Sequence, residues 1–428
     1  MSKAIEPGTV KKSLSAHAAI GLIAGALLYI ISLTGTVAVF YQELQRVEQP
    51  TAPEMAAIAP EAVQRGIEAV LASEAGKPTT THLYVHLPVE DMPRATVTTD
   101  TQAQHLTPEG TMAGPEEIAW SDFLVQLHYT LNLPVLIGIT IVGILGVMML
   151  ALVVSGVVAH PRIFRDAFRL RARNGNGTGL ADWHNRLSVW TLPFTVAIAL
   201  TGALIGLASV AAYAIAADDY DGDVEAVYGP IFGAEGEPDP RPAPAPNVAG
   251  ALAHMAEAYP EVEVTYAILH DPLTRGQHVQ IVGAHDRRLI FGEYYAFNAD
   301  GGFEHSAGLS DGELGQQASA STYDLHFGTF GGLPVKLAYV LFGVALTAIC
   351  GTGTYIWLGK RRRRGIEEPG LRGAWHGLIV GTPAALLLSF VARLLLGNEA
   401  SFAAVFWLCL LAAIVVGGLI AQRNVAAS

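Results

Sequence analysis

Cysteine is almost absent from this sequence of 428 residues, which contains only Cys350 and Cys409. Both lie inside long apolar runs, so we expect no disulfide framework and no structural zinc site, and we interpret both as packing residues. Charge is also scarce, at 15% of residues, whereas a soluble domain usually has about 25%. Such a composition indicates either large buried cores or lipid-facing helices, and the distribution of the apolar residues decides between them.

A dinucleotide-binding fingerprint is also missing. The glycines within residues 174–179 follow no strand, so we expect no nicotinamide or flavin bound by a Rossmann-type turn. The formal net charge is −12, which argues against nucleic acid as a partner. We also expect no cleaved signal peptide, because the first apolar run is too long for one.

Six apolar blocks are present, each about as long as the 20 residues that a helix needs to cross the hydrocarbon of a bilayer. They predict six membrane-spanning helices, at residues 17–41, 133–158, 187–217, 334–358, 375–396 and 402–421.

Charge divides the segments between the blocks into two kinds. Residues 42–127 hold 4 Lys or Arg against 13 Asp or Glu, and residues 218–325 hold 4 against 19. The short connections 159–182 and 359–373 are instead rich in arginine, and basic short loops stay in the cytoplasm. This bias predicts a multi-pass protein of the bacterial inner membrane, with both termini cytoplasmic and both acidic segments periplasmic. The arginines of the first basic loop are Arg162, Arg165, Arg169, Arg171 and Arg173.

One unit occurs twice in the sequence. In the first and third blocks a histidine, His17 or His184, precedes a Leu-Thr-Gly step by the same spacing. The second and fourth blocks are introduced by similar stretches, LHYTLNLP and LHFGTFGGLP, which contain His128 and His326. Each unit is therefore a span, an outer segment and a second span, and the copies are parallel repeats related by an axis along the membrane normal.

Small residues recur in the predicted spans. Ser155-Gly156 and Thr352-Gly353 occupy matching positions late in the second and fourth blocks. Small side chains allow helices to approach closely in a membrane. Further examples are Gly21, Gly25, Gly35, Gly138, Gly143, Gly146, Gly202, Gly343 and Gly351.

Both outer segments have the pattern of small α+β lobes, in which one helix packs on a small antiparallel sheet. Residues 235–247 contain five prolines and are interpreted as a linker before the second lobe. The predicted helices are 60–73 and 248–259, and the predicted strands are 82–87, 95–99, 262–269, 278–282 and 289–297.

The fold class that follows is a membrane α-helical bundle of about six spans, built on a duplicated two-span unit, with two α+β periplasmic lobes. The chain then divides into six parts: the N-terminus and first span (1–41), the first lobe (42–127), spans two and three with the basic loop (128–217), the second lobe (218–325), span four (326–360), and a basic loop with spans five and six (361–428).

Four repeated histidines are the candidate ligands of a cofactor. The predicted orientation puts His17 and His184 at the inner face of the membrane and His128 and His326 at the outer face. If the first and third helices are neighbours, and likewise the second and fourth, each pair can meet. Two histidines from facing helices can hold one haem iron as axial ligands. Two pairs predict two haems at different depths, which give an electron steps across the hydrocarbon.

Other ligand sets stay open. His160 also lies at the inner face and can replace His17 or His184, and His376 lies at the inner end of the fifth span. All four repeated histidines can instead be interfacial residues with packing roles. The lobe histidines can form a surface for an iron chelate, although we favour scattered solvated residues; they are His82, His86, His105, His254, His270, His278, His285 and His305.

These features resemble the PepSY-associated transmembrane helix proteins, which include iron-regulated membrane proteins and ferrisiderophore reductases. The resemblance lies in the repeated histidines, the Leu-Thr-Gly and Ser-Gly steps and the LHFG…GGLP stretch, and covers roughly residues 13–360. It implies PepSY-like lobes and b-type haems held by His17, His128, His184 and His326. It also implies reduction of ferric iron, often in a siderophore, on the periplasmic side. One departure is the Ala-His-Ala-Ala opening of the first span, where that family commonly has a basic residue after the histidine.

The first functional hypothesis is therefore electron transfer across the membrane to a ferric chelate or siderophore, fed by a quinol or a cytoplasmic reductase. A transporter of iron–siderophore complexes is one alternative, because duplicated spans are common in transporters. A non-catalytic PepSY membrane anchor is the other. In each case the remaining partner is membrane lipid, and the last two spans have no expected role beyond stabilising the bundle.

Overall fold

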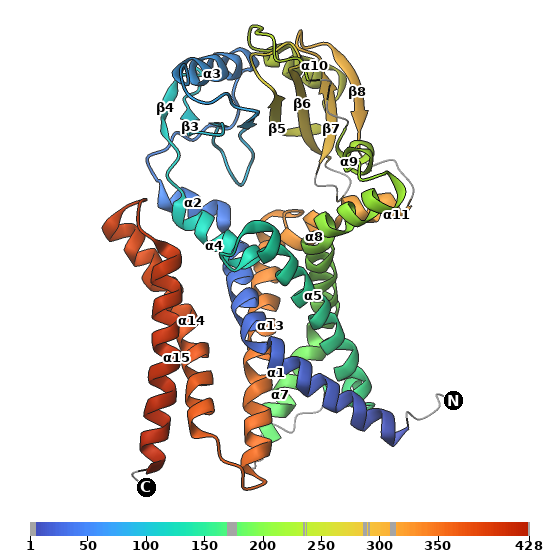
Figure 1. Ribbon diagram of the computed structural model, residues 1–428, viewed down its shortest axis with the longest axis vertical. Helices are drawn as coiled ribbons and strands as arrows, with labels where there is room; N and C mark the ends of the chain where they lie inside the picture. The colour runs from blue at the N-terminus through green and yellow to red at the C-terminus, as the bar shows by residue number, and fades with distance from the viewer. Residues whose placement is uncertain are drawn as a thin grey trace. The chain divides into compact units, whose positions relative to one another are not determined.

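The structure, a computed structural model, describes residues 6–168, 178–233, 236, 238–285, 289, 292–308 and 314–426. Arg169, Arg171 and Arg173 of the predicted basic loop lie outside these ranges. The chain forms two compact units (Figure 1). The helical unit contains Met1–Tyr41, Ala119–Leu207 and Gly331–Ser428, and the sheet unit contains Gln42–Ile118 and Ala208–Phe330.

Among the residues that the structure describes, six helices of the helical unit are long and apolar enough to cross a membrane, namely α1, α5, α8, α13, α14 and α15. The six predicted spans are thereby confirmed in number and position. α8 belongs to this unit as far as Leu207. The helices that reach into the unit are α1 (Pro7–Ala38), α4 (Ala119–Thr130), α5 (Val135–Ala159), α6 (Ile163–Asp166), α7 (Thr178–Trp190), α8 (Leu192–Asp219), α13 (Gly332–Arg362), α14 (Pro369–Leu396) and α15 (Phe402–Ala426).

The predicted histidines do not open the spans as expected. His17 lies inside α1, which begins at Pro7 because proline fits the first turn of a helix and the polar turns before the apolar run continue it. His128 lies on α4, a separate helix before α5. The break falls where Leu131 and Asn132 take φ values of 56° and 57°, which a right-handed helix cannot include.

The second repeat has similar breaks. His184 lies on α7, which ends before α8 begins. His326 lies on α12 (Thr322–Phe327), a short helix that precedes α13. The chain between them takes positive φ at Gly328, Gly331 and Gly332. Of the four repeated histidines, all except His17 are therefore carried by a helix next to a span, and the apolar pattern alone could not distinguish that helix from the span.

Small residues bring the spans close together, as their spacing predicted. A Cβ atom on Gly143 of α5 would lie 2.8 Å from the backbone of Gly206 on α8, and one on Gly146 would lie 2.9 Å from Ala203. Real Cβ atoms do not approach so closely, so these helices can pack in this way only through glycine.

The last two spans form a hairpin of their own that packs on the other helices. A Cβ on Gly377 of α14 would lie 2.2 Å from the carbonyl oxygen of Ala413 on α15. The Trp375 indole donates to the Gly351 carbonyl of α13 at 3.0 Å, and the Trp120 indole of α4 donates to Ser389 at 2.9 Å. These contacts agree with a stabilising role for the hairpin.

In the described part of the sheet unit, one antiparallel sheet has eight strands in the order β4-β3-β2-β1-β5-β6-β7-β8. The prediction of one small sheet in each lobe was therefore incomplete, because β1 of the first lobe pairs with β5 of the second. Each half is a helix followed by four strands. The strands are β1 (His82–His86), β2 (Thr96–Thr98), β3 (Ala103–Leu106), β4 (Met112–Pro115), β5 (Val262–His270), β6 (His278–His285), β7 (Glu293–Phe297) and β8 (Phe303–Ala307).

The predicted lobe helices are confirmed, and they pack on the sheet around one hydrophobic core. That core includes Ile67 of α3, Met255 of α10, Leu83 of β1 and Phe297 of β7, all buried. The Gln64 side chain of α3 also accepts a hydrogen bond from the Val248 amide at the start of α10, at 2.9 Å. The helices of this unit are α2 (Tyr41–Glu48), α3 (Pro60–Ser73), α9 (Glu225–Phe232), α10 (Val248–Ala258), α11 (Leu314–Ala320) and α12.

Substituting Gly110 with alanine is expected to destabilise the sheet unit. Gly110 closes the turn before β4 with a φ of +81°, and a Cβ there would lie 2.0 Å from the carbonyl oxygen of Ala62 in α3. Positive φ and overpacking together should cost about 2–5 kcal/mol. The matched control is Gly76→Ala, which has a φ of +88° but open space, so about 1–2 kcal/mol is expected. Hydrogen exchange of the α3 amides measures the difference. Equal protection in both variants would contradict the expectation.

Candidate cofactor site

His17 is fixed on α1 by hydrogen bonds to α5. Its Nδ1 atom lies 3.0 Å from the Leu152 carbonyl oxygen and 3.2 Å from the Ser155 hydroxyl. A carbonyl oxygen can only accept, so Nδ1 carries the proton and Nε2 has the lone pair. Ser155 donates its own proton to the Ala151 carbonyl at 2.6 Å, and its oxygen therefore also accepts from His17. The ring is held in the tautomer that a metal ligand requires.

His184 is fixed in the same way by the other half of the repeat. Its Nδ1 atom lies 2.9 Å from the Thr352 hydroxyl of α13, which donates its own proton to the Ala348 carbonyl at 2.8 Å. The hydroxyl oxygen therefore accepts from Nδ1, and Nε2 again carries the lone pair. Thr352 corresponds to Ser155 in the repeat, so one sequence device orients both imidazoles.

The residue after each hydroxyl is the glycine of the small-residue step. A Cβ on Gly156 would lie 3.2 Å from Cε1 of His17, and a Cβ on Gly353 would lie 3.8 Å from Cε1 of His184. These glycines leave room for the rings. The Ser155-Gly156 and Thr352-Gly353 steps were visible in the sequence. We interpreted them only as helix-packing residues, and their role in positioning the histidines was not predicted.

The structure brings the predicted inner pair together. The ring centres of His17 and His184 are 6.4 Å apart and the planes are inclined by 86°. An ion between two opposed imidazoles, with metal–nitrogen bonds of about 2 Å, would hold the ring centres about 6 Å apart. The donor set, the separation and the tautomers therefore fit a haem with two axial histidines.

A cavity of about 640 Å³ opens beside this pair, within the helical unit. Its volume is in the range of sites for drug-sized ligands and cofactors. Apolar side chains from α1, α5, α8 and α13 form much of its lining, among them Leu28, Met149, Leu192 and Leu346. Basic side chains line it as well, namely Lys11, Lys360, Arg361, Arg363 and Arg364. An apolar interior with a cationic part suits a flat apolar cofactor that bears carboxylates.

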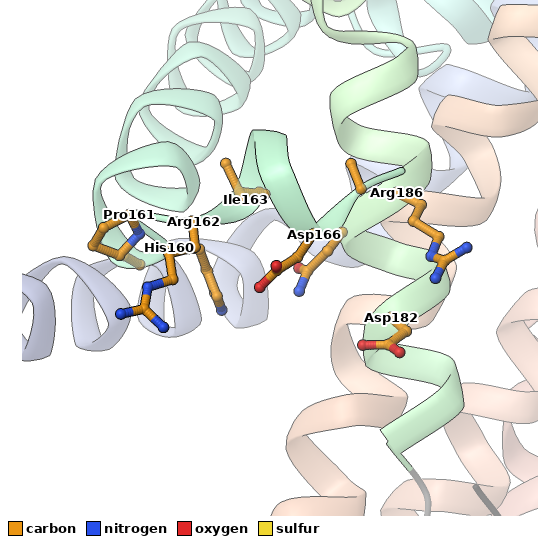
Figure 2. Close-up of a pocket in the computed structure, with 10 residues that line it drawn as sticks. His160, Pro161, Arg162, Ile163, Asp166, Asp182 and Arg186 are labelled. Carbon is orange, nitrogen blue, oxygen red and sulfur yellow. The ribbon is translucent and has the colours of Figure 1, made fainter. Parts of the chain in front are cut away.

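A second, smaller cavity of about 310 Å³ lies at the α5–α6 turn (Figure 2). His160, Arg162 and Asp166 line it from the turn, and Asp182 and Arg186 line it from α7. The lining of this cavity therefore contains two positive side chains, Arg162 and Arg186, and two negative ones, Asp166 and Asp182.

His160 lines this cavity and also the larger one, so it stays close to the inner pair. Its Nδ1 atom is 3.3 Å from the Gly156 carbonyl. The ring contact of His17, however, is made with His184, which favours the predicted pair over one containing His160.

His128, the first member of the predicted outer pair, lies against α1. Its Nδ1 atom is 3.0 Å from the Ile31 carbonyl oxygen, so this ring also has its lone pair on Nε2. Gly35 faces the ring so closely that a Cβ there would lie 2.5 Å from Cε1 of His128. His326 belongs to the sheet unit, and the pairing of His128 with His326 stays a prediction. The remaining candidate, His376, is exposed on α14 and lies 3.0 Å from the Tyr355 hydroxyl.

The fold and the site together define a membrane protein made of a helical bundle with an antiparallel sheet unit and paired histidines. Residues 14–360 match the family described as the PepSY-associated TM region, and the chain belongs to that family. Its similarity to the uncharacterized protein PA4219 of Pseudomonas aeruginosa is 27% identity over 273 residues. That alignment covers 56% of this chain and 64% of the relative, so the chain spans less than two thirds of the relative's length.

Proposed function

We propose that this chain is a haem-b protein of the bacterial inner membrane that transfers electrons across the bilayer to ferric iron or a ferrisiderophore in the periplasm. The observation that carries the proposal is the His17–His184 pair, with ring centres 6.4 Å apart and both Nδ1 atoms engaged. By the repeat, His128 and His326 form the second pair. A haem supplies one-electron exchange between ferric and ferrous iron.

The chain's own residues would do the rest. Ser155, Thr352 and the Leu152 carbonyl hold the two imidazoles so that Nε2 of each ring is presented as a ligand. The apolar lining of the cavity excludes water and lowers the local dielectric, which tunes the reduction potential. Lys360 and Arg364 offer positive charge for the carboxylates of the cofactor, whereas Arg361 is already paired with Glu368 at 2.6 Å. The electron donor would be a quinol or a cytoplasmic reductase.

The test begins with the purified chain, which should be red and should show a split Soret band and a sharp α band after reduction with dithionite. The chain is then inserted into liposomes that contain a ferric chelate and a ferrous-specific dye, and a membrane-impermeant reductant is added outside. Dye colour should develop with the wild-type chain and not with a His17→Ala, His184→Ala variant. Colourless protein would refute haem binding, and red protein that develops no dye colour would refute ferric reduction alone.

A further inference from the structure

Three histidines of the sheet unit lie side by side on neighbouring strands. His82 of β1 is directly opposite His270 of β5, and His270 is directly opposite His278 of β6. Their ring centres are 5.0 Å apart for His82 and His270 and 4.3 Å apart for His270 and His278. We call these residues the three-histidine row. The sequence interpretation of scattered solvated residues is wrong for them, because it could not foresee that β1 and β5 pair.

The backbone register brings the side chains of the row close together. The neighbouring pair Thr81–Asp271 is hydrogen-bonded, with the Asp271 amide donating to the Thr81 carbonyl at 2.8 Å. Such pairs alternate along an antiparallel ladder, so His82 and His270 form a non-hydrogen-bonded pair, in which Cα atoms are only about 4.5 Å apart. Leu83 and Leu269 face the hydrophobic core, so the histidines lie on the opposite face of the sheet.

The middle histidine is half-buried, and both of its ring nitrogens are shielded from solvent without the partners that buried nitrogens need. Within the described part of the chain, neither ring nitrogen of His270 has a hydrogen-bond partner, and Nδ1 of His278 also has none. Burial and the neighbouring His278 and His82 together lower the pKa of His270 to about 3, against an opposing effect of the Gln280 side chain. Buried polar atoms without a partner require an explanation, and a bound ion is one.

The first member of the row has the second sphere that metal-binding histidines usually have. Nδ1 of His82 lies 3.2 Å from the Thr81 hydroxyl, which lies 3.4 Å from the Asp100 carboxylate. The hydroxyl proton points to Asp100, so the hydroxyl oxygen accepts from Nδ1–H and the lone pair of His82 is on Nε2. Outer partners of this kind fix the tautomer and raise the basicity of a ligating imidazole.

We propose that the three-histidine row binds one divalent cation of the late first-row type, with Cu²⁺ held most tightly, through His82, His270 and His278. Neutral imidazoles prefer these ions, and copper stands at the top of their affinity order. Two imidazoles on one ion, at tetrahedral or right angles, have ring centres about 4–5 Å apart, and both neighbouring pairs of the row, His82–His270 and His270–His278, have this separation.

Binding requires a turn of the rings. His270 and His278 are stacked within 5° of parallel, and among the described residues no group of three ligands is already arranged around an ion. The terminal torsion of histidine is broad, so the rings can turn without moving the backbone.

The test titrates the purified full chain with Cu²⁺ alone and follows binding by calorimetry and by electron paramagnetic resonance. Wild type should bind one tight equivalent whose spectrum shows nitrogen splitting from imidazoles, a signal distinct from that of low-spin haem. His270→Ala should weaken binding at least about 10-fold and reduce the nitrogen splitting. The matched control is His305→Ala, an exposed residue on β8 of the same sheet, which should leave both unchanged.

Hydrogen exchange of the β5 and β6 amides shows whether the His270→Ala variant keeps its fold. A second variant, His278→Ala, removes a histidine at the end of the row and should also weaken Cu²⁺ binding. Binding that is unchanged in both variants, or absent from wild type, would overturn the proposal. The outcome does not depend on the proposed haem function, because the His17→Ala, His184→Ala variant should bind Cu²⁺ as wild type does.

Discussion

The His184→Ala variant should retain about one haem per chain, where wild type should hold about two. His184 is the ligand candidate that the Thr352 hydroxyl orients, at 2.9 Å from its Nδ1 atom. Removing the imidazole leaves His17 as the sole ligand of the inner pair, and a single axial bond in a wide cavity should not retain the cofactor through purification. The pyridine haemochrome assay on detergent-purified protein measures the stoichiometry, and the reduced α band should lose about half of its amplitude.

Two further variants make this expectation specific. His376→Ala removes an exposed histidine that lies 3.0 Å from the Tyr355 hydroxyl, and it should leave the stoichiometry unchanged. Thr352→Val removes only the hydroxyl that orients His184, so haem should be bound about 10–100-fold more weakly without loss of the ligand. Two haems retained in His184→Ala, combined with one lost in His160→Ala, would show that His160 is the ligand and would refute the pair assigned here.

The spans and the inner pair were predictable because both depend on local or repeated sequence. Apolar length is sufficient to define α1 or α5, whatever the rest of the chain does. The inner pair followed from duplication, since equal spacing before a Leu-Thr-Gly step puts His17 and His184 at equal depth. The helix break at Leu131 and Asn132 was not predicted, although Asn132 and Pro134 favour a helix boundary, because the stretch was interpreted as the opening of one span and positive φ at leucine is uncommon.

The strand order of the sheet could not be predicted from the sequence, for a different reason. Each lobe has its own helix and strands, and pairing β1 with β5 depends on two edges that are separated by more than 170 residues of chain. The alternation of apolar and polar residues in β1 and β5 does not specify which strand will pair with their free edges. The three-histidine row arises from this pairing, so it was equally hidden. The hydroxyls of Ser155 and Thr352 were visible as a repeat, and their role became clear only when the rings beside them were seen.

Gly35→Ala is expected to displace the His128 ring and release the second haem while the first stays in place. The new Cβ would lie 2.5 Å from Cε1 and 2.9 Å from Nδ1 of His128. Because the ring is the movable partner, it should swing away and lose its hydrogen bond to the Ile31 carbonyl at 3.0 Å. The haemochrome assay should then show about one haem in place of two, and one low-spin ferric signal should disappear.

The glycines beside the other histidines supply the controls. Gly353→Ala puts a Cβ 3.8 Å from His184 and Gly156→Ala puts one 3.2 Å from His17, so the effect should rise in the order Gly353, Gly156, Gly35. A Gly35→Ala protein that keeps both haems and both ferric signals would show that His128 is not an axial ligand. Gly202 stands in the second repeat where Gly35 stands in the first. If the repeat holds the outer haem as it does the inner one, Gly202→Ala should release the same haem as Gly35→Ala, and the double variant should lose no more than either single one.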